Sequence, residues 1–176
     1  MSQSTFDPAT LYGDEPEKRP DLPEGFMKPD AEFEARKGSH IGSGVGRNVY
    51  EVKDNPDADI KESKDVTPAP NWLEYFIWSA VRGTAIEAKF GQLLGISESG
   101  RFLMMERLSD LDDAEYESTP APPTWLNDVK KNAFGRNADG KIRIRDYGAV
   151  EIGNLLASAP TRLAGWQTTR KRLGIG

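Results

Sequence analysis

The residue types best suited to chemistry begin with a glycine-rich segment that contains Gly42, Gly44 and Gly46. A backbone without side chains can approach a phosphate group closely. Lys61 follows, and a compact ammonium group on a long stem suits phosphate binding. Both features also have an ordinary structural interpretation, since most glycine hairpins are simple turns and a lysine on a strand is usually exposed. An anion-binding hairpin is therefore indicated only in combination with further residues.

The composition excludes several other kinds of site. The 176 residues include no cysteine, which rules out disulfide frameworks, cysteine-ligated zinc and cysteine nucleophiles. His40 is the only histidine, which argues against a multi-histidine metal centre and a Ser-His-Asp triad. With 23 Lys and Arg against 28 Asp and Glu, the net charge of -5 argues against a general nucleic-acid coat. No apolar run reaches membrane-spanning length, so we expect a soluble, cytoplasmic protein without membrane association.

Periodicity predicts the elements that must position these residues in the first half of the chain. Residues 41–52 have a strand–turn–strand pattern around the glycines, and 59–62 form a short strand after turn residues 54–57. A helix is predicted from an N-cap at Asn71, after Pro70, to Gly83. Its apolar stripe has helical spacing and consists of Leu73, Phe76, Ile77, Ala80 and Val81.

The rest of the chain adds further strands and two terminal helices. Residues 90–96 and 101–108 are predicted to form a hairpin, and residues 140–145 alternate apolar and charged side chains as a strand with one buried face. Residues 149–158 and 161–172 are predicted to be short helices. Strands and helices do not alternate regularly, so the expected class is α+β rather than a parallel α/β fold.

In their order along the chain, these residues resemble the protein-kinase-like fold over residues 41–148. The segment from Gly42 to Tyr50 is similar to the glycine-rich hairpin that covers nucleotide phosphates, with Arg47 where the third glycine of that pattern would stand. This form resembles small kinase-like proteins of bacteriophages more than cellular kinases. The resemblance implies that Gly42, Gly44 and Gly46 bind a nucleotide.

The same resemblance assigns roles to three further residues of the first half. Lys61 matches the strand lysine that binds the α- and β-phosphates of ATP, and Glu74 matches the helix glutamate that orients this lysine. Glu74 is otherwise a favourable acid in the first turn of a helix. Residues 104–108, which include Glu106, correspond to the hinge that contacts the adenine.

In the second half, Asp146-Tyr147-Gly148 resembles the Asp-Phe-Gly motif that binds magnesium, and Asn132 resembles the catalytic-loop asparagine, the second magnesium ligand. Two oxygen ligands on neighbouring loops suit a phosphate-bound Mg²⁺, which keeps several waters. The resemblance therefore implies ATP and Mg²⁺ as cofactors, with Lys61, Glu74 and Asp146 among the catalytic residues.

The sequence departs from the family pattern in the catalytic loop and in the C-terminal lobe. The expected position of the catalytic aspartate holds Asn127, and Asp128 lies one residue later. Asp128 can act as the base only if the loop is one residue shorter, and both alignments stay open. Trp125 replaces the usual histidine. After Gly148 only 28 residues remain, which leaves no room for a protein-substrate platform.

The expected organisation has four parts. Residues 1–38 form an extended or disordered acidic arm, with five prolines and nine acids. Residues 39–108 form the kinase-like N-lobe, an antiparallel sheet with one helix, and 109–124 an acidic, Pro-rich linker. Residues 125–176 form a reduced C-lobe. Its basic tail, with Arg162, Arg170, Lys171 and Arg172, is the one place where nucleic-acid contact would be expected.

Three functions are compatible with this pattern. The first is a pseudokinase, viral by the resemblance, that binds or inhibits a host or viral protein in the host cytoplasm, with or without nucleotide. The second is a minimal Mg-ATP-dependent phosphotransferase, because phosphoryl transfer needs mainly positioning and charge neutralisation. The third is a structural or assembly protein whose arm orders on a partner. The missing C-lobe and Asn127 favour the first.

Overall fold

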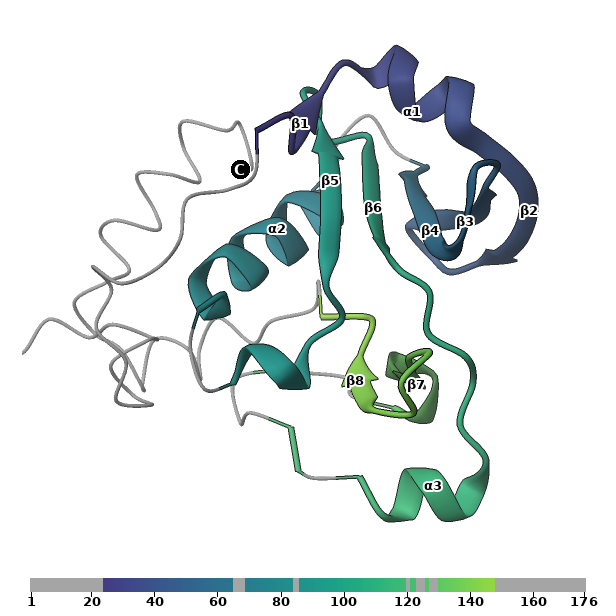
Figure 1. The fold of residues 1–176 in the computed structure, drawn as a ribbon, viewed down its shortest axis with the longest axis vertical. Helices are drawn as coiled ribbons and strands as arrows, with labels where there is room; N and C mark the ends of the chain where they lie inside the picture. Colours follow the sequence, from purple (N-terminus) through teal and green to yellow (C-terminus); the bar gives the residue numbers. More distant parts are fainter. Residues whose placement is uncertain are drawn as a thin grey trace, which may run out of the picture.

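The computed structural model describes residues 24–64, 69–83, 86–119, 121–122, 126 and 130–147. Within these residues the chain forms a six-stranded mixed sheet, three α-helices and a separate two-stranded hairpin (Figure 1). The predicted α+β class is confirmed, but the sheet is mixed rather than wholly antiparallel, and it is accompanied by more than one helix. The predicted helices at 149–158 and 161–172 lie outside the described residues.

The strands of the sheet lie side by side in the order β1-β5-β6-β4-β3-β2. Their bounds are β1 Met27–Lys28, β2 Lys37–Ser43, β3 Arg47–Val52, β4 Asn55–Ser63, β5 Leu93–Ser97 and β6 Phe102–Glu106. The helices are α1 Asp30–Arg36, α2 Ala69–Val81 and α3 Asp113–Glu117, with short 3₁₀ turns at Glu87–Lys89 and Lys131–Ala133. The separate hairpin consists of β7 Phe134–Arg136 and β8 Ile142–Ile144.

The predicted hairpins are present with changed bounds. β2 and β3 pair antiparallel on either side of the glycine-rich turn, and β5 and β6 pair antiparallel as expected. β4 is longer than the predicted strand at 59–62, and the turn before it is confined to Lys53 and Asp54. β4 pairs with both β3 and β6 from Asp59 to Glu62, and its N-terminal extension pairs with β3 alone, Asn55 opposite Val52.

Helix α2 forms where the apolar stripe predicts it, but Asn71 is not its N-cap. The helix begins at Ala69, with Pro70 in its first turn, where the fixed φ of proline is favourable. Asn71 is fully buried and donates hydrogen bonds from Nδ2 to the carbonyl oxygens of Gly100 and Arg101, at 2.9 and 2.8 Å. The side chain therefore connects the helix to the β5–β6 turn and is not available to cap it. Gly83, at φ 77°, follows the helix end as a glycine in the left-handed region commonly does.

Residues 24–38 belong to the folded core, which differs from the extended arm expected over residues 1–38. β1 pairs in parallel with β5, Met27 opposite Ile96, and makes the sheet mixed. Phe26 is 6% exposed and stacks on Trp78 of α2, with ring centroids 5.3 Å apart. Phe33 of α1 is buried on the sheet. Two aromatic side chains are thus enough to hold a segment that is otherwise polar.

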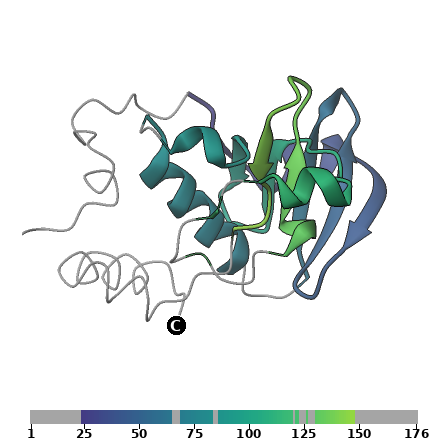
Figure 2. The ribbon, with the colours of Figure 1, turned by 90° about the horizontal axis from the view of Figure 1, so that it is seen from below.

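The two faces of the sheet carry separate hydrophobic clusters. Helix α2 covers one face, where its residues pack with those of β5 and β6. Helix α1 covers part of the other face, where Phe33 packs with residues of β3, β4 and β6. In Figure 2, α2 and the curled strands β2–β4 lie on opposite sides of the molecule. Side chains of β4 therefore alternate between the α1 face and the α2 face.

The β7–β8 hairpin packs at the lower end of the sheet and shares its core (Figure 1). Phe134, Ile144 and Tyr147 belong to the same buried cluster as the residues of α2. Ile144 also forms a β-bridge with Phe90. In the described part of residues 125–176, the hydrophobic core is thus continuous with that of the sheet.

The segment predicted as an acidic linker, residues 109–124, contains the short helix α3. Asp112 caps the helix, and Asp112 and Glu115 form a capping box in which each side chain accepts from the other residue's backbone N–H. Leu111 is buried in the core. Three acids of the segment pair with cations of residues 131–145; these pairs are Asp110 with Arg145, Asp113 with Lys131, and Glu115 with Arg136. These ion pairs connect α3 and the residues before it to the β7–β8 region, while the side chains of Asp110 and Asp113 remain exposed.

Candidate functional site

The centre of the candidate site is a buried ion pair between Lys61 of β4 and Glu74 of α2. Nζ of Lys61 donates to both carboxylate oxygens of Glu74, at 3.1 and 2.9 Å. Ile60 faces the α1 side of the sheet, so strand alternation turns Lys61 towards α2. Glu74 lies on the same helical stripe as Trp78 and Val81, which pack on the sheet. The structure thus brings together two of the residues that the sequence singled out.

Arg47 adds a second cation to this pair. Its Nη2 lies 2.9 Å from Oε1 of Glu74 and 2.7 Å from Oδ1 of Asp146. Its Nη1 lies 3.4 Å from Oδ1 of Asn71. Arg47 is the first residue of β3, directly after the glycine-rich turn, and its side chain is only 11% exposed. The guanidinium therefore connects the glycine hairpin, helix α2 and the chain after β8.

The residues that follow β8 complete the cluster. Nζ of Lys61 donates a short hydrogen bond to the carbonyl oxygen of Arg145. The backbone N–H of Tyr147 donates to Oε1 of Glu74 at 3.2 Å, and its hydroxyl donates to the carbonyl oxygen of Gly91 at 2.9 Å. Tyr147 is fully buried, whereas the side chain of Asp146 is 57% exposed. Of the two carboxylates in the cluster, Asp146 is thus the one that solvent reaches readily.

The electrostatic environment keeps Glu74 ionised. Burial acts to raise the pKa of Glu74, but Arg47 and Lys61 outweigh it and lower the pKa to about 2. Burial acts to lower the pKa of Arg47, and the carboxylates of Glu74 and Asp146 outweigh it, so this pKa is raised. Burial lowers the pKa of Lys61, and Glu74 opposes this only in part. Arg47 is therefore the permanent positive charge of the cluster.

The glycine-rich turn itself is closed by bonds within the chain. The N–H of Gly44 donates to the carbonyl oxygen of Arg47 at 2.8 Å, and Nζ of Lys64 donates to the carbonyl oxygen of Gly44 at 2.7 Å. A Cβ at Gly42, Gly44 or Gly46 would meet no described atom closer than 3.9 Å, and none of the three has a positive φ. Packing within the described chain therefore does not require these glycines. A bare backbone is compatible with close approach of another molecule.

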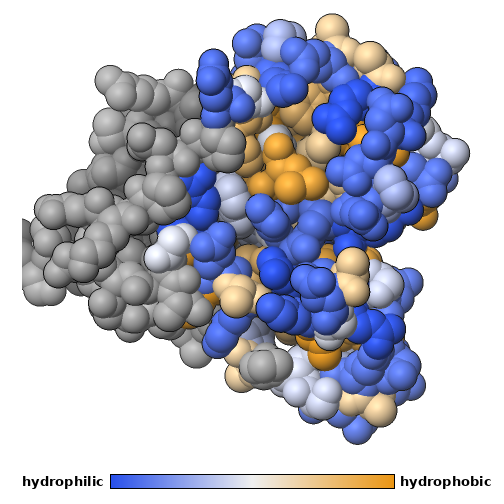
Figure 3. All heavy atoms as spheres, in the orientation of Figure 1, coloured by the Kyte–Doolittle hydropathy of each residue, from blue (hydrophilic) through white to orange (hydrophobic). Residues whose placement is uncertain are grey.

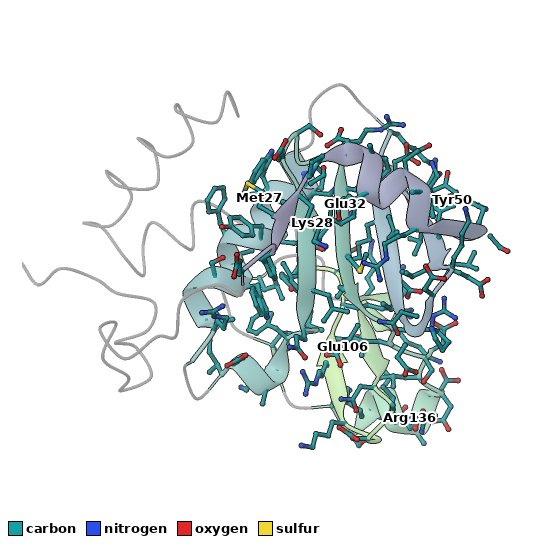
Figure 4. All side chains as sticks on the ribbon, turned by 45° about the horizontal axis from the view of Figure 1, so that its top comes forward. Met27, Lys28, Glu32, Tyr50, Glu106 and Arg136 are labelled. Atoms are coloured by element: carbon teal, nitrogen blue, oxygen red, sulfur yellow. The ribbon has the colours of Figure 1, made fainter. Side chains whose placement is uncertain are left out.

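The residues predicted to contact an adenine are already bonded within the chain. Oε1 of Glu106 accepts from the N–H of Gln92 at 2.8 Å and lies 2.9 Å from Nη1 of Arg143. Figure 4 labels Glu106 near the end of β6 where the β7–β8 hairpin meets the sheet. In the following residues, the N–H of Arg107 donates to Asp57, and the carbonyl oxygen of Leu108 accepts from Arg145. The side chain of Glu106 therefore has a structural role in this arrangement.

The predicted magnesium ligands lie on loops that touch each other. The N–H of Asp146 donates to the carbonyl oxygen of Ala133 at 3.3 Å, which places the residue after Asn132 beside Asp146. Asn132 is exposed. Among the described residues no group of three or more His, Asp or Glu side chains could hold a metal ion. Because Oδ1 of Asp146 is bound by Arg47, the donor set does not fit a divalent cation in this arrangement.

Three further positions were singled out by the sequence. Asn127 and Asp128, the alternative positions of the catalytic base, lie outside the described residues. His40 is exposed on β2, where its Nε2 lies 2.8 Å from Oγ of Ser43 and its ring packs edge-on against Tyr50. The sole histidine is therefore not part of the Lys61–Glu74 cluster.

Sequence reasoning missed the part that Arg47 plays in the site. Its position in place of a glycine was visible, but its two carboxylate partners lie 27 and 99 residues away. The pairing of the acidic segment 109–117 with the basic residues 131–145 was also missed. No local pattern signalled it, because only Arg145 of the three paired cations lies in the alternating segment 141–145, whereas Lys131 and Arg136 lie outside it.

No model of a known protein family matches the sequence, and a search of curated proteins also gives no match. None of the helices in the described ranges is long and apolar enough to cross a membrane.

Proposed function

We propose that this chain is a kinase-like pseudoenzyme, a binding module for a protein partner that retains the architecture of a nucleotide site without phosphotransfer activity. The order of elements supports the resemblance. Strands β2, β3 and β4 form a meander, helix α2 follows, and β5 and β6 complete the antiparallel part of the sheet. The Lys61–Glu74 ion pair joins the third of these strands to the helix, and Asp146 follows the β7–β8 hairpin.

The observation that carries the proposal is the position of Arg47. Its guanidinium binds Glu74 and Asp146 at once, and Asp146 is the carboxylate that a phosphotransferase would need for a metal ion. Nζ of Lys61 is likewise occupied by both oxygens of Glu74 and by the carbonyl of Arg145. A triphosphate would have to displace these internal partners. The bonds within the cluster therefore favour a site that stabilises the fold over one that binds and transfers a phosphate group.

Exposed apolar side chains on the β2–β3 hairpin and on β5 support a protein partner. Val45 at the tip of the glycine hairpin is fully exposed, and Ile41 of the edge strand β2 is about half exposed. On the face shown in Figure 3, apolar atoms gather over β5 among hydrophilic surroundings, and Leu94 of β5 is exposed. Edge strands with unpaired backbone groups are common sites of protein association.

An ATP turnover assay with Mg²⁺ tests the proposal directly. Wild-type protein and Asp146→Asn are compared for ATP hydrolysis and for phosphate transfer to themselves and to a generic protein acceptor. We expect both proteins to stay at background. Turnover in the wild type that Asp146→Asn abolishes would overturn the proposal.

Partner binding has its own test. Deleting residues 1–23 leaves β1 intact, whereas deletion through residue 38 would remove β1 and α1. Immobilised full-length and truncated proteins are compared for capture of proteins from lysate. The proposal expects a specific partner on the full-length protein and weaker capture after truncation with unchanged thermal unfolding. Equal capture would exclude the N-terminal residues as a contact.

A second candidate, the minimal Mg-ATP-dependent phosphotransferase, is favoured by one observation. The Lys61–Glu74 ion pair is formed, and a kinase requires this pair for activity. The exposed carboxylate of Asp146 lies next to it. If the protein is a phosphotransferase, Arg47 must leave Asp146 when Mg-ATP binds. The wild type then hydrolyses ATP or transfers phosphate in the turnover assay, and Asp146→Asn does not.

A further inference from the structure

Arg47 lies between two carboxylates that come from different parts of the fold. One Nη2 atom is 2.9 Å from Oε1 of Glu74 on α2 and 2.7 Å from Oδ1 of Asp146 after β8. A single cationic group thus bridges one oxygen from each acid. Bridging oxygens of two carboxylates is also the task that a divalent cation performs in an oxygen-ligand site.

The charges of the cluster balance only because Arg47 is present. Arg47 and Lys61 contribute two positive charges, and Glu74 and Asp146 contribute two negative charges. The group is largely removed from water, since Glu74 is fully buried and Lys61 nearly so. In such surroundings an unbalanced charge is costly. A neutral residue at position 47 would leave a net negative charge beside the exposed Asp146.

The position of Arg47 is itself held by the surrounding structure. Oδ1 of the fully buried Asn71 lies 3.4 Å from its Nη1. The turn bond from Gly44 and the bond from Lys64 to Gly44 keep the start of β3 in place. The guanidinium is thus directed into the cluster rather than out into solvent, where an arginine on a strand end would normally extend.

We propose that Arg47 is a resident cation: it binds Oδ1 of Asp146, the carboxylate that a divalent metal ion would need as a ligand, holds it next to Glu74, and so makes the wild-type site refractory to such ions. This inference rests on the proposed function and deepens it, because it names the residue that closes the site. It predicts that a neutral residue at position 47 opens a cation site with Asp146 as a ligand, whether or not the protein turns over ATP.

The test uses Mn²⁺ as the probe, because bound Mn²⁺ is measured directly by electron paramagnetic resonance. Arg47→Gln removes the charge and retains an amide that can still donate to Glu74. Arg47→Lys retains the charge. Lys53→Gln is the matched control, since it removes one positive charge from the turn at the other end of β3, where Nζ of Lys53 donates to the carbonyl oxygen of Ala35.

We expect wild type, Arg47→Lys and Lys53→Gln to bind Mn²⁺ no better than Asp146→Asn does. Arg47→Gln should bind it about tenfold or more tightly than wild type, because the competing charge is gone. The double variant Arg47→Gln/Asp146→Asn should lose this gain. The thermal unfolding midpoint of Arg47→Gln should rise on addition of Mn²⁺, because an ion that binds only the folded state stabilises that state.

Two results would overturn the inference: Mn²⁺ binding by the wild type that Asp146→Asn abolishes, or no gain in folded Arg47→Gln. If Arg47→Gln does not fold, Mn²⁺ binding by the wild type that Asp146→Asn abolishes would still overturn the inference. Failure of the proposed function gives a different pattern. Mg-ATP turnover by the wild type that Asp146→Asn abolishes refutes both the pseudoenzyme and the resident cation, whereas Mn²⁺ binding without turnover refutes only the resident cation.

Discussion

Tyr147 donates its backbone N–H to Oε1 of Glu74 over 3.2 Å, although 73 residues separate the two in the chain. Glu74 also accepts from Lys61 of β4 and from Arg47 of β3. One buried carboxylate on α2 therefore holds together the glycine hairpin, the centre of the sheet and the chain after β8.

Replacing Glu74 by alanine should lower the free energy of unfolding by about 3–5 kcal/mol, because it leaves Lys61 and Arg47 without their common buried partner. Glu32→Ala is the control, since Glu32 pairs with Lys28 on the surface, with 51% of its side chain exposed. Its loss should cost no more than about 1 kcal/mol. Urea unfolding measures both. Similar values for the two variants would contradict a central role for Glu74.

The stability of the wild type should fall with pH in a window set by Glu74. Its pKa is about 2 in the folded protein and near 4.5 when the chain is unfolded. The unfolded state therefore takes up the proton first, and the contribution of Glu74 is complete above pH 4.5 and lost as the pH falls towards 2.

In Glu74→Gln this contribution is absent at every pH. The difference in unfolding free energy between wild type and Glu74→Gln should accordingly shrink as the pH falls from about 5 to about 2. Chemical unfolding at several pH values measures it, with Glu32→Gln as the control. A difference that stays constant over this range would show that the pKa of Glu74 is not depressed.

Asn71→Ala should destabilise the fold by about 1–3 kcal/mol, because it removes the donor from the carbonyl oxygen of Gly100 and one of the two donors from that of Arg101, which also accepts from the N–H of Ser63. The exposed Asn132 provides the control, and Asn132→Ala should be nearly neutral for stability. Hydrogen exchange should also show faster opening of the β5–β6 turn in Asn71→Ala. Unchanged exchange there would mean that Asn71 does not hold the turn to the helix.

Substitution of Gly100 and of Gly140 by alanine separates the effect of packing from that of backbone conformation, because the two glycines have nearly equal φ. Gly100 and Gly140 have φ of 76° and 79°, so alanine is strained at both positions. A Cβ at Gly140 meets nothing within 4 Å, whereas one at Gly100 would overlap the indole of Trp72. Gly100→Ala should therefore cost about 1–3 kcal/mol more than Gly140→Ala. Equal losses in urea unfolding would show that Trp72 moves aside freely.

Phe26→Ala tests whether β1 is part of the core. Phe26 is 6% exposed and stacks on Trp78, so truncation should cost about 3–5 kcal/mol. The neighbouring Met27 is 46% exposed, and Met27→Ala should change the unfolding free energy by less than about 1 kcal/mol. If both changes are small, residues 24–28 do not contribute to stability in solution.

Local pattern was enough to predict the elements whose side chains follow one clear period. The apolar stripe of α2 and the glycine-bounded hairpin β2–β3 are examples, because spacing along the chain decides which face is buried. Lys61 and Glu74 were placed in one site by resemblance, and they are in contact. The identity of the catalytic base stays a prediction, since Asn127 and Asp128 lie outside the described residues.

Other features depend on contacts that no local pattern encodes. Phe26 and Phe33 are single aromatic residues in a polar, Pro-containing segment, and their burial follows from surfaces supplied by α2 and the sheet. The acids of residues 109–117 suggested a free linker because their cations lie further along the chain.

The contacts of Arg47 are the clearest example of a feature that the sequence pattern does not predict. Local pattern was enough to predict that an arginine lies in a glycine hairpin, that Glu74 lies on a helix and that Asp146 follows a strand. The contact of one guanidinium with both acids, across 27 and 99 residues, depends on the packing of the fold. The reason is physical: a buried carboxylate needs a nearby cation, but which cation can reach it depends on how strands and helix pack, not on their order in the chain.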